Sequence, residues 1–401
     1  MPGAAKSSAV KVYLDHNATT PLHPAVLQAM LPYLTERFGN ASSVHAWGQE
    51  ARQALENARR IVAGALGAID KDTLVFTGSG TEADNLALRG VLEARDGGHR
   101  HLIVSAAEHH AVLHVADFLE RRGCAVTRLH VDQGGLLDPE DVQRAIRPET
   151  ILVSLMHSNN ETGVLSPIGE VARICRDRGV LLHTDAVQSF GKVPLAVESL
   201  GVDLASVSGH KIHAPKGIGA LYVRRGTKML SLLHGGRQER SRRGGTENVA
   251  GAVGLACAVE LMHRDLEDAG RRLGDLRDRL ELGLMGGVSG AIRNGHPARR
   301  LPHTSNLSFP GADAESVIVA LDLHGVGVSS GAACSSGSLE PSHVLTAMGL
   351  PPDRVRGAIR FSLGRGTTAE EIDYVLEVLP PIVERIRRAN GVVLAGTERN
   401  A

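Results

Sequence analysis

Short apolar runs rich in β-branched residues alternate with amphipathic helical patterns through the first half of the chain. This alternation is typical of crossover units that build a mainly parallel sheet. Helices are expected at residues 81–94, 111–122 and 168–178. Strands are expected at residues 73–77, 101–105, 124–131, 150–156, 180–184, 204–208 and 219–223. The pattern therefore predicts an α/β fold whose large domain contains a mainly parallel, seven-stranded sheet.

A second, smaller α/β domain is expected after a Gly- and Arg-rich stretch at residues 235–245. A long helical pattern follows from about residue 249 to 284, with a break expected near Gly270. Further strands are expected at residues 305–309 and 359–363, and further helices at residues 314–323 and 369–387. We place the large domain at residues 16–262. The small C-terminal domain would then comprise residues 263–401, with residues 1–15 packed against it.

The charge of the chain is balanced, with 44 Lys and Arg residues against 44 Asp and Glu residues. No overall field therefore favours nucleic acid or an anionic membrane as a partner. The first ten residues do not resemble a secretory signal, and no apolar run approaches transmembrane length. We expect a cytoplasmic protein.

Four cysteines lie far apart without a C-x-x-C pair, which argues against a structural zinc site and a disulfide framework. Cys124, Cys175 and Cys257 lie in apolar patterns and are expected in the core. Cys334 differs because it lies in a run of nine small residues, 329–337. Such a loop is expected to be exposed and mobile, so reactivity explains this thiol better than packing does.

Polar residues follow three of the expected strands, and ligands of open α/β sheets bind at such strand ends. Small residues at positions 77–82 open a helix with backbone N–H groups that suit a phosphate, although plain capping is the alternative. Asp185 could pair with a pyridinium nitrogen, and Gln188 could reach a ring hydroxyl. Lys211 lies in a basic loop and could form a Schiff base with an aldehyde. A solvated surface lysine is the alternative, and it loses to the Schiff base because the other two features lie on neighbouring strands.

With these residues in view, the chain resembles the cysteine desulfurases, a class V, fold-type I family of pyridoxal-phosphate (PLP) enzymes of the nitrogen-fixation and iron–sulfur assembly type. The resemblance covers nearly the whole length. It is carried by the motifs YLDHNATTP at residues 13–21, NASS at 40–43, SGHK at 208–211, CSSGSLEPS at 334–342 and IRFSLG at 359–364.

The resemblance implies roles for individual residues of this sequence. Lys211 would hold PLP as a Schiff base, Asp185 would contact the ring nitrogen, and His109 would stack on the ring. The neighbouring His110 competes with His109 for this role, and the motif favours His109. The phosphate would be bound by Gly80, Thr81, Ser208 and His210, together with Thr246 from the opposite subunit of a homodimer. Asn160 and Gln188 would flank the ring oxygen, and Arg360 with Asn160 would bind the substrate.

The resemblance further implies that Cys334 receives the sulfur of free L-cysteine as a persulfide, leaving L-alanine, with Lys211 as the base that removes the α-proton. The sulfur acceptor stays open between an iron–sulfur scaffold, a tRNA thiolation relay and nitrogenase maturation. The residues after Cys334 resemble the long-loop group, in which the thiol could transiently ligate a nascent iron–sulfur cluster.

Three alternatives have to be weighed against a cysteine desulfurase. A selenocysteine lyase would use the same fold and cofactor. An ordinary aminotransferase has no need of Cys334. A non-catalytic scaffold that only docks a sulfur acceptor should have lost at least one of the four central residues, which are Lys211, Asp185, His109 and Cys334.

Overall fold

The computed structural model describes residues 11–95, 98–331 and 341–391. Cys334, the predicted sulfur-accepting residue, lies outside the described residues. Among the described residues, no helix is both long and apolar enough to cross a membrane.

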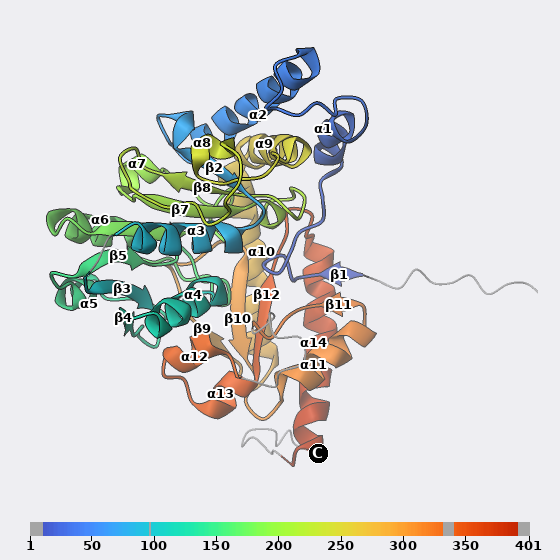
Figure 1. Cartoon of the computed structure of the whole chain (residues 1–401). Helices are drawn as coiled ribbons and strands as arrows, with labels where there is room; N and C mark the ends of the chain where they lie inside the picture. Colours follow the sequence, from blue (N-terminus) through green and yellow to red (C-terminus); the bar gives the residue numbers. More distant parts are fainter. Residues whose placement is uncertain (1–10, 96–97, 332–340, 392–401) are drawn as a thin grey trace, which may run out of the picture.

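A seven-stranded sheet forms the centre of the large domain (Figure 1). All neighbouring strands in it are parallel except that β8 runs antiparallel to both β2 and β7. The mainly parallel, seven-stranded sheet of the predicted α/β fold is thus confirmed. In spatial order the strands are β2 (Leu74–Thr77), β8 (Gly219–Val223), β7 (Leu204–Ser208), β6 (Leu181–Asp185), β5 (Thr150–Ser154), β3 (Arg100–Ser105) and β4 (Cys124–Leu129).

Helices cover both faces of this sheet, and alternate residues of a strand enter different cores. Leu102 and Val104 of β3 pack with helices α3 (Gly80–Glu93) and α4 (His110–Arg121), whereas Ile103 enters the core on the other face. That second core includes residues of α1 (Pro24–Thr35), α2 (Ala46–Ala65), α5 (Pro139–Ala145), α6 (Ile168–Asp177) and α9 (Val249–His263). Burial on both faces explains why the inner strands, such as β8 and β5, are mostly apolar, whereas the edge strand β4 is partly exposed.

The small domain has a three-stranded antiparallel sheet in the order β12 (Ala358–Ser362), β10 (Thr304–Ser308) and β9 (Ile292–Asn294). Helices α10 (Leu266–Gly287), α11 (Ala314–Leu323) and α14 (Ala369–Ala389) share one apolar core with it. Val12 and Leu14 belong to the same core, and β1 (Val12–Tyr13) pairs with β11 (Val326–Gly327). The first described residues therefore pack with the small domain, while the domain limits at residues 262 and 263 stay a prediction.

The predicted break of the long helical pattern near Gly270 is wrong. Helix α9 ends at His263 and α10 begins at Leu266, so Gly270 lies inside α10. A glycine inside a helix costs only about 1 kcal/mol and need not end it. The chain breaks instead where Arg365 donates to the carbonyl of Met262 at 2.6 Å and pairs with Asp265, so one side chain binds both helix ends.

The remaining elements are short. They are α7 (Val197–Leu200), α8 (Gln238–Ser241), α12 (His343–Ala347), α13 (Pro352–Arg356) and the 3-10 turns at Lys71–Thr73 and Gly209–Lys211. Of the three described cysteines, Cys124 and Cys175 are buried as predicted. Cys257 is only partly buried and packs at the edge of a core.

Candidate active site

Lys211 lies in the 3-10 turn that directly follows β7. Its Nζ donates to the backbone oxygens of Asn17, at 2.5 Å, and of Ala18, at 2.8 Å. The amine is thus held between the carboxyl end of the large sheet and the segment that follows β1. This is the sheet edge at which the sequence predicts a ligand.

Asp185 is the last residue of β6, the strand next to β7, and is only 6% exposed. Its Oδ1 accepts a hydrogen bond of 2.8 Å from the backbone N–H of Val187. Burial raises the pKa of Asp185, while the Val187 N–H and the charge of Lys211 act in the opposite direction. A buried carboxylate of this kind favours a cationic partner such as a protonated pyridine nitrogen.

His109 and His110 differ in their surroundings. His109 caps α4, its Nδ1 accepting from the backbone N–H of Ala111 at 3.1 Å, so the neutral ring carries its proton on Nε2. Burial, followed by the positive charge of Lys211, lowers the pKa of His109 to about 4. His110 instead lies against His343 and His114, with ring centroids 4.4 and 4.8 Å apart. The charge of Lys211 thus acts on the His109 ring, which is neutral at pH 7.

The turn at the start of α3 brings three strand ends together. Ser79 caps the helix by accepting from the backbone N–H of Glu82 at 3.0 Å. A Cβ atom at Gly80 would lie 2.8 Å from Val187 Cγ2 and 3.2 Å from Ser208 Cβ, so no larger residue fits. Ser208 Oγ is buried and has no hydrogen-bond partner among the described residues. A buried hydroxyl without a partner, next to a helix N-terminus, suits a phosphate oxygen.

The other residues predicted to bind phosphate lie around this turn or on the surface. His210 contacts Thr19 Oγ1 through Nδ1 at 3.1 Å, and burial with the charge of Lys211 lowers its pKa to about 4. Thr81 and Thr246 are exposed. Thr246 lies three residues beyond Arg243, whose Nε donates to Glu82 Oε1 at 2.9 Å.

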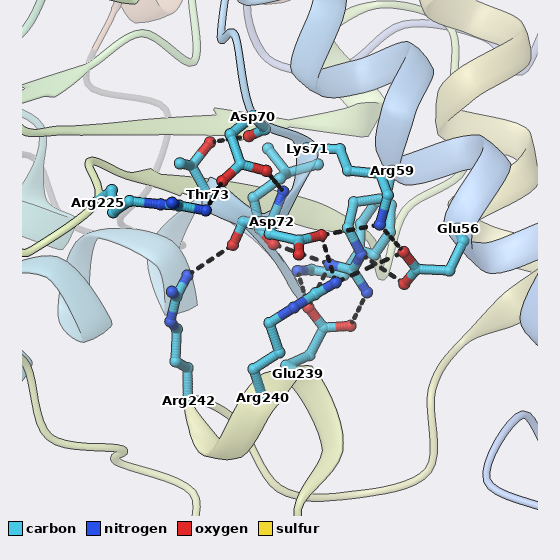
Figure 2. Close-up of polar contacts among 12 residues, drawn as sticks. Glu56, Arg59, Asp70, Lys71, Asp72, Thr73, Arg225, Glu239, Arg240 and Arg242 are labelled. Atoms are coloured by element: carbon cyan, nitrogen blue, oxygen red, sulfur yellow. Dashed lines mark hydrogen bonds and ion pairs between the residues drawn. The ribbon is translucent and has the colours of Figure 1, made fainter.

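The segment before Thr246 is held by a buried ion pair, which Figure 2 shows in close-up. Arg59 of α2 donates from Nη1 and Nη2 to the two carboxylate oxygens of Glu239, both at 2.7 Å. Glu239 Oε2 also accepts from the backbone N–H of Phe76 in β2 at 3.0 Å. The backbone φ angles of Glu239, Arg240 and Ser241 are 45°, 56° and 64°, a left-handed conformation that side chains disfavour. The ion pair offsets this strain and fixes the segment against the strand that leads into the phosphate turn.

Asn17, to which no role was assigned from the sequence, lies at the centre of the site and is 1% exposed. Its backbone oxygen accepts from Gln188 Nε2 at 3.0 Å as well as from Lys211. Its side chain donates to Thr304 Oγ1 at 3.0 Å and to the Asn160 oxygen at 3.2 Å. The one available signal was the polar run at residues 15–20, which follows an apolar strand as the other site segments do.

Arg360 of β12 is buried and already paired. Its Nη2 donates to Asp15 Oδ1 at 2.7 Å and its Nη1 to the Asn160 backbone oxygen at 3.0 Å. Arg360 Nε and Asn160 Oδ1 are buried without a hydrogen-bond partner among the described residues. A substrate carboxylate would therefore meet a guanidinium that Asp15 shares, which the sequence did not indicate.

The donor set fits PLP. The Lys211 amine lies near the buried carboxylate of Asp185, which suits the ring nitrogen, and near the neutral ring of His109, which suits the ring face. The Ser208 hydroxyl and the Asn160 amide oxygen have no hydrogen-bond partner among the described residues and could bind further polar atoms of the cofactor. The fold and the site together define the class of fold-type I PLP enzymes.

Comparison with known proteins narrows this class. The family model "Aminotransferase class-V" matches residues 12–375. The chain is 48% identical to "Cysteine desulfurase IscS" of Dictyoglomus turgidum over 377 residues, which cover 94% of this chain and 95% of the relative. It is also 48% identical to the protein of that name from Methanosarcina thermophila over 376 residues, 94% of this chain and 93% of the relative.

Solved structures agree with these relatives. A structure described as "NifS-like protein" superposes with a TM-score of 0.86 at 37% identity, covering 95% of this chain and all of that one. "SspA in complex with cysteine" superposes with a TM-score of 0.80 at 36% identity, covering 89% of this chain. The chain belongs to the class-V aminotransferase family and, within it, to the cysteine desulfurases. The predicted fold type and the PLP cofactor of the family are thereby confirmed.

Proposed function

We propose that this protein removes the sulfur of L-cysteine with PLP held on Lys211, and that Cys334 takes the sulfur as a persulfide while L-alanine is released. The observation that carries the proposal is the position of the Lys211 amine beside Asn17, next to the strand end that bears Asp185. The 48% identical relatives named as cysteine desulfurases support the choice of substrate.

Each residue has a task that follows from its surroundings. Bound PLP withdraws electrons from the Cα of the amino acid attached to it. Asp185, buried and accepting one backbone N–H, would hold a proton on the ring nitrogen. The neutral ring of His109 would lie on the cofactor face without adding positive charge. Lys211, held by two backbone oxygens, is the base for the α-proton.

The described residues that flank the Cys334 segment support its role. Both flanks meet the buried side chain of Glu161, because Ser342 donates to Glu161 Oε2 at 2.5 Å and a Cβ at Gly331 would lie 2.7 Å from the same atom. Glu161 follows Asn160, whose backbone oxygen binds Arg360. The thiolate of Cys334 would attack the substrate sulfur, forming the S–S bond as the C–S bond breaks with its electron pair left on carbon.

Two variants test these assignments. Cys334→Ser should abolish alanine formation from cysteine and leave the absorbance of the bound cofactor intact, whereas Cys257→Ser, which alters a partly buried thiol, should keep wild-type turnover. Full turnover by Cys334→Ser would refute the sulfur assignment. Lys211→Ala should lose borohydride-fixable cofactor, with the exposed Lys216→Ala as control. Retention of covalent PLP in Lys211→Ala would refute the cofactor assignment.

A homodimer is part of the proposal. Leu27, Leu31 and Leu34 form one stripe of α1 and are 41%, 38% and 59% exposed, and Phe38 beyond the helix is 74% exposed. Such a contiguous apolar surface is typical of an interface, and the exposed Thr246 could then reach the partner's phosphate. Light scattering should give a dimer mass, and Leu34→Glu should shift it toward the monomer. Leu323→Glu, which alters an 82% exposed leucine of α11, is the control. A monomeric wild type contradicts the proposal.

We propose that the sulfur passes to an acceptor protein. Of the possible acceptors, an iron–sulfur scaffold comes first, because the relatives carry the name IscS. Capture of partners by the persulfide form, with Cys334→Ser as the blank, tests this. A transient role of Cys334 as a cluster ligand and a cytoplasmic location stay predictions.

A further inference from the structure

A second lysine lies beside Lys211. Lys192 follows the turn after β6, is partly buried, and lines a pocket between the two domains together with Lys211, His16 and His303. Its Nζ donates to Gln188 Oε1 at 3.2 Å. None of the motifs recognised in the sequence gave Lys192 a role.

This contact determines the orientation of the Gln188 amide. The ammonium of Lys192 can only donate, so the amide oxygen must face it. On the other side, Gln188 Nε2 donates to the backbone oxygen of Asn17 at 3.0 Å, and a carbonyl can only accept. Turning the Gln188 amide over would place its N–H groups against the Lys192 ammonium and its oxygen against the Asn17 oxygen. Both neighbours therefore select the same orientation of the amide.

One consequence concerns the atom that Gln188 presents to a ligand. With its oxygen occupied by Lys192 and one N–H by Asn17, the amide has a second N–H to offer. Gln188 is 6% exposed and therefore has little water to bind instead. The group that it presents is a hydrogen-bond donor, which suits an oxygen that carries negative charge.

We propose that Lys192 is a positioning residue for the cofactor: it locks the Gln188 amide with its N–H toward the ring oxygen of PLP and places a positive charge behind that amide. The proposal rests on the proposed function, since it takes Gln188 as a neighbour of the ring oxygen.

The charge of Lys192 depends on the buried histidines of the pocket and on two neighbouring cations. The histidines that line the same pocket are neutral at pH 7, because burial lowers the pKa of His16 to about 4 and that of His303 well below its usual value, with the charge of Lys192 adding to both. Burial lowers the pKa of His213 as well, again with a contribution from Lys192. The other cations that act on Lys192 are Lys211 and Arg360, and Arg360 is paired with Asp15. Burial, with the charges of Lys211 and Arg360 adding to it, lowers the pKa of Lys192 to about 7, so the amine carries its full positive charge only below that pH.

The test uses the PLP-loaded protein and two readouts that do not require turnover. Lys192→Met should raise the dissociation constant of PLP about tenfold or more, because a charge-supported hydrogen bond to the ring oxygen is lost. A nearby cation favours loss of the proton that titrates on the bound cofactor. Removing the cation in Lys192→Met should therefore raise the pH midpoint at which the absorbance of the bound cofactor changes. Lys192→Arg, which keeps the charge and the donor, should restore both values toward wild type.

Controls separate positioning from general damage. Lys216→Met removes an exposed lysine five residues beyond Lys211 and should change neither value. Gln188→Glu, which keeps the side-chain shape and removes the N–H donor, should shift the midpoint in the same direction as Lys192→Met, and it serves if the latter does not fold. A wild-type midpoint and PLP affinity in either variant overturns the inference. Failure of the proposed function can be distinguished from failure of this inference, because an error in the Lys211 assignment would appear as covalent PLP retained in Lys211→Ala.

Discussion

The buried Arg59–Glu239 pair provides the sharpest test of the reasoning on stability. The two side chains are 2% and 3% exposed, and each Glu239 oxygen accepts a 2.7 Å hydrogen bond from Arg59 (Figure 2). Within the described part of the chain, Arg59→Met would leave the buried carboxylate with a single donor, the backbone N–H of Phe76. It would also release the left-handed backbone at Glu239, Arg240 and Ser241 from its main attachment.

The size of the effect follows from burial. Removing one partner of a buried ion pair costs about 3–5 kcal/mol, because the remaining charge is left without compensation. The neighbouring Arg60 is exposed and hydrogen-bonds Asn57 on the same helix at 2.7 Å, so Arg60→Met should cost about 0.5 kcal/mol or less. The expected difference between the two variants is therefore several kcal/mol.

Urea denaturation followed by far-UV circular dichroism measures this difference, with both variants compared at one protein concentration and one PLP concentration. Arg59→Met should unfold at a clearly lower urea concentration than Arg60→Met, and it should lose PLP more readily, because the segment leading to Thr246 is no longer fixed. A free energy of unfolding within about 1 kcal/mol of that of Arg60→Met would refute the reasoning, since measured costs for breaking buried pairs lie well above that value.

Two further predictions concern a glycine of the phosphate turn and a buried carboxylate. Gly80→Ala should weaken PLP binding at least about tenfold, because its methyl group would lie 2.8 Å from Val187. Gly64→Ala, with open space around it, should bind PLP as wild type does, and titration of the apo protein with PLP compares the two variants. Burial alone would raise the pKa of Glu281, but hydrogen bonds from Arg300, Ser305 and Arg293 lower it to about 2. The contribution of Glu281 to stability is thus fully present above about pH 4.5 and is lost as the pH falls toward 2. In Glu281→Gln the free energy of unfolding should therefore fall less steeply with decreasing pH in this range. Urea titrations at several pH values measure this dependence, and a slope equal to that of the wild type contradicts the prediction.

Much of the fold was predictable because the strands are buried on both faces. The strands at residues 204–208 and 219–223 have the predicted bounds, since a short run of apolar residues ends where polar ones begin. Helices α1 and α2 were not predicted, although α2 alone spans 20 residues. The break after α9 was misplaced, and the side chain that binds both helix ends there, Arg365, lies about a hundred residues further along the chain. Such a contact leaves no local pattern.

The site divides in the same way. Lys211 and Asp185 could be located because parallel strands carry their loops to one edge of the sheet, a rule that needs only the order of strands. Asn17 and Lys192 could not, because their importance lies in hydrogen bonds to residues far away or in the donor geometry of a single amide. Asp15 was overlooked as the partner of Arg360 for the same reason, as 345 residues separate the two.

These long-range contacts also link the two domains to the chemistry. The backbone N–H of Asn17 donates to Ser362 Oγ of the small-domain sheet at 2.9 Å, and the backbone oxygen of the same residue accepts from Lys211 of the large domain. Docking of the small domain therefore helps to position one of the backbone oxygens that accept from the Lys211 amine. A variant that loosens this docking, such as Ser362→Ala, should slow covalent attachment of PLP more than it weakens the initial binding of PLP. The phosphate turn is built from large-domain residues alone, so it remains intact when the docking is disturbed. Stopped-flow absorbance separates the two steps, and equal effects on both would contradict the link.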